Sequence, residues 1–222
     1  MKYKGLLAQL LALFVVTTCL TIRVSAADNP QQIEGKIQRN VYTAKNNLFS
    51  IAIPHREGSY EYAYMKVKEE FHGEQGAYVS FGPAAFNQSI YRVGLYRIEN
   101  DDNFDHVSQQ LVDNFRSQLE NIYQTALSTE TPLGKDSING REARHGIFVQ
   151  KIPVGITISN GKMETLESVH RHEVYVIDFI TFKALIWVQL PDNKQSDKSM
   201  NIVASLSPGI SPRAFAESLT IH

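Results

Sequence analysis

One stretch of the chain, residues 101–127, carries apolar residues at helical spacing, whereas its flanks alternate apolar and polar residues. The apolar residues lie three or four positions apart and share one helical face: Phe104, Val107, Leu111, Phe115, Leu119, Ile122 and Ala126. Residues 101–103 offer N-terminal caps, and Asp105 places negative charge in the first turn, where the helix dipole favours it. A helix that is apolar on one side must cover another layer. We therefore predict a helix over about 103–127 that lies on a sheet.

Segments of period two on both sides of this helix predict the strands of that sheet. Before the helix, "LFSIAIP" (48–54) and "YEYAYMKVKEEF" (60–71) alternate and enclose a turn at Gly58. We expect these two segments to form a hairpin. "AYVSF" (77–81) and "IYRVGLYRI" (90–98) are predicted as the next two strands.

After the helix, "LGKDSING" (133–140) is interpreted as a turn-rich loop whose closing Asn-Gly pair suits a tight hairpin turn. "REARHGIFVQKI" (141–152) is predicted as a strand. The apolar segment 174–190 is either one long bent strand or two strands that turn near 181–183.

The C-terminal part has the signals of shorter helices. Residues 196–209 could form one, and Ser211 followed by Pro212 is a typical start of another. Strands arranged around one long amphipathic helix predict an α+β fold, with a largely antiparallel sheet, that helix and shorter C-terminal helices.

The N-terminus has the pattern of a secretory signal peptide over residues 1–26. Lys2 and Lys4 precede an apolar run, and "VSA" (24–26) offers small residues for cleavage. A retained membrane anchor is one alternative, although the run is short of the about 20 apolar residues that a spanning helix needs. Lipidation of Cys19 is the other alternative. The protein is thus expected to be exported, either periplasmic or secreted, with no membrane span after cleavage.

The remaining chain is expected to consist of a flexible N-terminal arm (27–40) and a single α+β domain (41–222). Cleavage would remove Cys19, the one cysteine, so the mature domain would have to fold without disulfides. It would also remove three of the 22 basic residues and none of the 23 acidic residues. No basic cluster would be left to bind nucleic acid, so we expect no such partner.

His170 and His172 are the candidate metal ligands. Residues two apart on a strand point the same way, so both rings could reach one zinc ion. Glu173 would face the opposite side, and Asp178 would lie too far along the strand to complete the site. The alternative is that the pair is the solvated end of a strand, which we prefer, with no cofactor. Asp178 itself is expected at a bulge or turn, with general-base catalysis as its alternative role.

Tyr60, Tyr62 and Tyr64 would lie on one face of the strand predicted over 60–71, flanked by Lys66 and Lys68. Tyrosine offers a large contact area with a polar group at its tip and is enriched in interfaces. These three tyrosines are therefore the candidate binding surface, unless a helix or loop covers that face.

Three motifs together resemble the PsbP-like family: "FSIAIP" (49–54), "INGREARHGIFV" (138–149) and "FAESLTI" (215–221). They occur in the family's order and span most of the chain, with the long helix between the first two. The resemblance implies an antiparallel sheet flanked by helices, used as a binding or assembly module without shared catalytic residues. The apolar segment 174–190 and the lack of a tryptophan after Pro54 depart from the family pattern.

The sequence lacks the short motifs of common hydrolases, zinc proteases and nucleotide-binding enzymes. We therefore expect an exported, non-enzymatic binding or assembly module that acts through a sheet face on another protein or an envelope component. The alternative is a metal-dependent enzyme or metal carrier that uses His170 and His172 with zinc.

Overall fold

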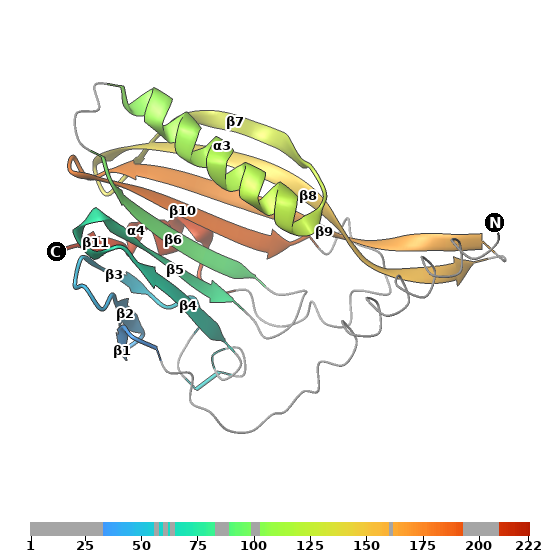
Figure 1. Ribbon diagram of the computed structural model, residues 1–222, viewed down its shortest axis with the longest axis horizontal. Helices are drawn as coiled ribbons and strands as arrows, with labels where there is room; N and C mark the ends of the chain where they lie inside the picture. Colours follow the sequence, from blue (N-terminus) through green and yellow to red (C-terminus); the bar gives the residue numbers. More distant parts are fainter. Residues whose placement is uncertain are drawn as a thin grey trace, which may run out of the picture. The chain divides into compact units, whose positions relative to one another are not determined.

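The computed structural model describes residues 33–55, 58–59, 62, 65–82, 89–98, 103–159, 162–192 and 209–222. Two antiparallel sheets, the long helix α3 (Phe104–Tyr123) and the short helix α4 (Pro212–Glu217) make up most of the described residues (Figure 1). No helix in these ranges is long and apolar enough to cross a bilayer.

The larger sheet consists of two meanders that meet in its middle. In the described chain it has seven strands, in the order β4-β5-β6-β10-β9-β8-β7. Their bounds are β4 (Lys66–Phe71), β5 (Gly76–Gly82), β6 (Ile90–Arg97), β7 (Leu127–Ile138), β8 (Arg141–Ser159), β9 (Lys162–Asp178) and β10 (Phe182–Pro191). α3 connects β6, in one meander, to β7, in the other, and β10 returns to pair with β6.

The smaller sheet joins both ends of the described chain. Its order is β1-β2-β3-β11, with bounds β1 (Lys36–Gln38), β2 (Val41–Thr43), β3 (Phe49–Ala52) and β11 (Thr220–Ile221). β1 lies within the segment that the sequence suggests as a flexible arm. The backbone amides of Glu34 and Gly35, just before it, donate to the carboxylate of Glu69 on β4 at 2.6 and 2.8 Å.

Each face of the larger sheet has its own apolar core. One core packs the small sheet and α4 against it, with Phe49, Tyr91 and Phe215 buried. The other packs α3 against the face that carries Phe148 and Trp187. Successive side chains of a strand point to opposite faces, so each central strand supplies both cores.

The α+β prediction is wrong. The fold is mostly antiparallel sheet, and α3 is the one helix of seven residues or more in the described chain. α4 is six residues long, and the helix expected at 196–209 lies outside the described residues except for Gly209. The region interpreted as a loop, 133–140, instead forms the end of β7 and its turn. β7 is an edge strand, where polar residues and Gly are tolerated because one side faces solvent.

Two local predictions have different outcomes. The hairpin predicted over 48–71 is wrong, because β3 pairs with β2 and β11 whereas β4 pairs with β5. The two-strand interpretation of 174–190 is confirmed, with β9 ending at Asp178 and β10 starting at Phe182. Asp178 has the turn role: its carboxylate accepts hydrogen bonds from the Ile180 amide at 2.7 Å and the Lys183 amine at 3.0 Å.

The helix prediction is confirmed in position and is wrong in part of its face. Asn103 caps α3 by accepting from the His106 amide at 3.1 Å. Val107, Val112 and Leu119 are buried, whereas Ile122 is 69% exposed. Ile122 extends past the part of the sheet that α3 covers.

Replacing Phe115 by Ala should lower the free energy of unfolding by roughly 3–5 kcal/mol. Its ring is 7% exposed and lies 4.9 Å from the Trp187 ring, so truncation leaves a cavity in the α3 core. The matched control is Gln110→Ala on the exposed side of the helix, which should cost less than about 0.5 kcal/mol. Urea denaturation measures both, and equal losses would show that the assigned helix face is wrong.

Candidate functional site

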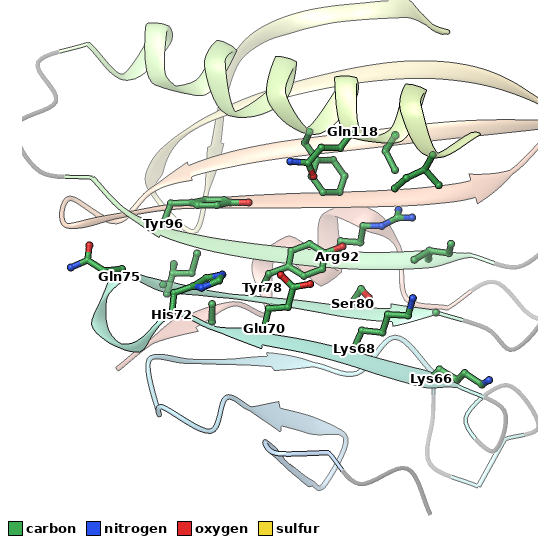
Figure 2. A pocket seen from close by; sticks show the side chains of 18 of the residues that line it. Lys66, Lys68, Glu70, His72, Gln75, Tyr78, Ser80, Arg92, Tyr96 and Gln118 are labelled. Atoms are coloured by element: carbon green, nitrogen blue, oxygen red, sulfur yellow. The ribbon is translucent and has the colours of Figure 1, made fainter. Parts of the chain in front are cut away.

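A cavity of about 860 Å³ lies between α3 and the strands β4, β5 and β6 (Figure 2). It exists because α3 packs over the β7–β10 half of the sheet and leaves the β4–β6 half uncovered. The helix contributes Phe115, Leu119 and Ile122 together with the polar Gln118, and the strands contribute charged and polar side chains along with aliphatic and tyrosine side chains. The helix wall is thus mainly apolar, and the charged groups of the cavity are on the strand wall.

The polar wall follows from the register of the strands. Lys68 on β4 pairs with Ser80 on β5, Ser80 with Arg92 on β6, and Arg92 with Trp187 on β10. Residues directly opposite one another in an antiparallel sheet lie on the same face. A cationic row therefore crosses the uncovered part of the sheet and ends at the tryptophan beneath α3.

Arg92 is a buried cation at this wall, with 7% of its surface exposed. Its Nη2 donates to Oε1 of Gln189 at 3.1 Å, and its guanidinium lies 5.9 Å from the centre of the Phe115 ring. Its Nη1 is buried and has no hydrogen-bond partner. Within the described residues no carboxylate forms an ion pair with it. An unpaired buried charge is costly, so Arg92 is well placed to receive an anion.

A directional hydrogen-bond chain runs from Arg92 into the sheet. Because Gln189 accepts from Arg92 through Oε1, its Nε2 must be the atom that faces Nδ1 of His170, at 3.2 Å. His170 therefore accepts at Nδ1 and carries its proton on Nε2, which faces the Ser168 hydroxyl at 3.0 Å. The chain fixes the tautomer of the histidine and the orientation of the glutamine.

His172 is held in the same tautomer by Trp187. The indole Nε1 donates to Nδ1 of His172 at 2.9 Å, so the proton of the neutral ring is on Nε2. That Nε2 is buried and has no hydrogen-bond partner. Trp187 is itself packed between the Phe148 and Phe115 rings, at 5.6 and 4.9 Å between ring centres.

The interpretation of the histidine pair as a solvated strand end is wrong. His170 is 1% exposed and His172 is 0% exposed, because β9 begins at Lys162 and β8 and β10 flank the pair on both sides. Burial lowers the pKa of His170 to about 4, assisted by the charge of Arg92. Burial, Arg92 and His170 hold the pKa of His172 well below its ordinary value.

The geometry does not favour zinc at this pair. A metal ligand needs a free nitrogen lone pair, and in both rings the Nδ1 lone pair accepts a hydrogen bond while Nε2 carries the proton. No group of three or more His, Cys, Asp or Glu side chains in the described ranges is placed to hold a metal ion.

The tyrosine surface predicted from the sequence is not assembled as expected. Tyr60 and Tyr64 lie outside the described residues. Tyr62 precedes β4 and is half-buried against the core on the small-sheet side, so it does not share a strand face with Lys66 and Lys68. The two lysines line the cavity instead.

Sequence reasoning missed Arg92 and the cavity. The one available signal was an arginine within the apolar segment "IYRVGLYRI", on the face opposite Tyr91, Val93 and Leu95. That face looks solvent-exposed in an isolated strand. Arg92 is buried because β10, distant in the sequence, pairs with β6.

Comparisons with known proteins add little. No family model matches the sequence, and no curated protein matches it. A crystal structure from Bacteroides thetaiotaomicron aligns with 84% of this chain at 9% sequence identity and a TM-score of 0.42. The alignment covers 49% of that protein, so the present chain spans about half of its length.

The stability of the domain should fall as the pH drops from about 7 to about 5. Unfolded histidine titrates near 6.5, whereas folded His170 titrates at about 4, so protons bind preferentially to the unfolded chain between these values. Each buried histidine contributes up to about 1.4 kcal/mol per pH unit in this window. Urea denaturation of His170→Gln should give a shallower pH dependence, and the exposed control His106→Gln should match the original chain. Parallel curves for His170→Gln and the original chain would contradict the assignment.

Proposed function

We propose that the protein is an exported, non-enzymatic binding module whose ligand site is the cavity between α3 and strands β4–β6. The observation that carries the proposal is the cavity itself, about 860 Å³, with a mainly apolar helix wall facing a strand wall that carries more cations than carboxylates. Small-molecule sites are typically clefts of about 300–1,000 Å³ with mostly apolar linings and a few placed polar groups. The ligand class that fits both walls is a small amphiphilic molecule.

The polar wall is built for binding more than for catalysis. The hydroxyl of Ser80 is hydrogen-bonded to Tyr78. Burial raises the pKa of Tyr78, although Arg92 and Ser80 act in the opposite direction. A tyrosine with a raised pKa is not a base at neutral pH, so it cannot activate the serine. The exposed lysines of this wall, Lys66 and Lys68, are suited to attract an anionic ligand.

The location outside the cytoplasm remains part of the proposal and rests on the signal pattern of residues 1–26. A binding role also agrees with the resemblance to PsbP-like proteins. The segments that carry this resemblance lie together: Ile221 pairs with Phe49, and the side chain of Asn139 donates to the Glu217 carbonyl at 2.7 Å. None of the three segments contributes a residue to the cavity lining, so they are interpreted as structural.

The proposal moves the binding surface from the tyrosine stripe to the α3 side of the large sheet. It also replaces a whole-protein partner by a small ligand as the first occupant, because a concave site of this size encloses a small molecule more completely than a protein surface. The metal-dependent alternative has no comparable support, since the lone pairs of His170 and His172 are occupied.

The dye anilinonaphthalene sulfonate, an amphiphilic anion, should bind the folded protein with increased dye fluorescence. Ile122→Glu should weaken this binding at least about tenfold, because it places a carboxylate at the apolar wall. A tenfold change in affinity corresponds to about 1.4 kcal/mol of binding free energy. The matched control is Met163→Glu on β9, which removes another exposed apolar side chain away from the cavity.

Fluorescence titration measures the dye affinity of the three proteins, and circular dichroism verifies that each is folded. Equal dye affinity in Ile122→Glu and the original chain would contradict the proposed site. A loss as large in Met163→Glu would show that the dye detects exposed apolar surface in general.

A further inference from the structure

We infer that Arg92 is the head-group receptor of the cavity and that the ligand is an amphiphilic carboxylate. The carboxylate would bind the guanidinium, and the apolar body would lie along Phe115, Leu119 and Ile122 of α3. This inference rests on the proposed function and adds the chemistry of the ligand to it.

The charge of Arg92 has no partner of opposite sign among the described residues. Arg92 as a whole residue is 7% exposed, and its Nη1 makes no hydrogen bond. Arginine presents a planar fork of donors that matches a carboxylate in a bidentate manner. A bound carboxylate would neutralise the charge and supply the missing acceptor in one contact.

Arg92 is oriented before any ligand arrives. Gln189 holds Nη2, and Gln189 is itself fixed by His170. The Phe115 ring lies against the guanidinium from the helix side. Preorganised groups lose less conformational entropy on binding, so this fixed arrangement favours ligand recognition. Gln189 and His170 are positioning residues in this scheme, since they act through Arg92.

The strand wall around Arg92 carries more cations than carboxylates. Lys68 lies in register with Ser80 and Arg92, and Lys66 lines the same wall, against one carboxylate, Glu70 (Figure 2). Two strand spacings separate the backbones of Lys68 and Arg92, about 10 Å. The exposed lysines can therefore attract an anion to the mouth, whereas the buried arginine is suited to hold it.

Apolar side chains of α3 continue away from the guanidinium along the cavity wall. Phe115 contacts both Arg92 and Trp187, and Leu119 and Ile122 continue the same wall. An apolar chain attached to the carboxylate would therefore remain in contact with α3 after the head group reaches Arg92. Trp187, the one tryptophan of the chain, lies against Phe115 and provides a fluorescence signal for occupancy.

The test compares decanoate with decanol, which have the same chain and differ in the charge of the head group. Titration calorimetry and Trp187 fluorescence at neutral pH should give at least tenfold tighter binding of decanoate. Arg92→Gln should reduce decanoate affinity to that of decanol and leave decanol binding unchanged. The control Lys66→Ala, Lys68→Ala should keep most of the preference for decanoate.

The outcomes separate the two levels of the proposal. If neither amphiphile binds, the proposed function is wrong. If both bind the original chain equally, or if Arg92→Gln keeps the preference, the cavity binds ligands but Arg92 is not its head-group receptor. Loss of the preference in the lysine double variant alone would place the head group at the mouth of the cavity and overturn the inference.

If Arg92→Gln does not fold, two measurements still test the inference: the salt dependence of decanoate binding and the binding of decanoate to the lysine double variant. Contacts with exposed lysines weaken as salt increases, whereas contacts with a buried group are screened much less. A decanoate preference that persists in high salt and in the folded lysine double variant supports Arg92. A preference that disappears in either condition contradicts it.

Discussion

The central constraint of this fold is that one long helix covers about half of a large antiparallel sheet. In the described chain, α3 packs through Val112, Phe115 and Leu119 against the β7–β10 side, and the strands β4–β6 have no helix above them on that face. On the other face of the large sheet, the small sheet and α4 pack against the strands and form a continuous apolar core. The cavity is the direct consequence of this uneven coverage, and Ile122 is exposed because it reaches over the gap.

Buried polar side chains lie at the edge of the part of the large sheet that α3 covers, and they determine which ligands the cavity can bind. The chain from Arg92 through Gln189 and His170 to Ser168 satisfies most of its members internally, and Trp187 satisfies one nitrogen of His172. The groups left over, Nη1 of Arg92 and Nε2 of His172, are both donors. Polar networks in a core are costly when incomplete. Arg92 lines the cavity, so its unpaired donor is the one that a ligand acceptor there could satisfy.

Local features of the fold could be predicted from the sequence because short-range physics determines them. The period of α3, its Asn103 cap and the Asn139-Gly140 turn depend on neighbouring residues alone. The boundary between β9 and β10 was foreseen as one of two alternatives. The edge strand β7 was missed because its polar composition resembles that of a loop, and the sequence does not reveal that only one side of it is paired.

The candidate site could not be predicted because non-local pairing creates it. Arg92 is buried because β6 pairs with β10 and because Phe115 of α3 lies against its guanidinium. The histidine pair lies on β9, which β8 and β10 flank. In the sequence these residues look like the solvent-facing positions of alternating strands. Likewise, the tyrosine stripe required β4 to start earlier than Lys66, and Tyr62 instead packs toward the other core.

The most direct test of the account is a map of where a ligand binds. Nuclear magnetic resonance of the isotope-labelled protein, titrated with decanoate, follows every backbone amide at once. The account predicts shifts concentrated on β4–β6 and on the C-terminal half of α3, with Arg92 and Phe115 among them. Shifts concentrated on the small sheet, or on the end of β8 after Pro153 and the start of β9 that pairs with it, would contradict the account.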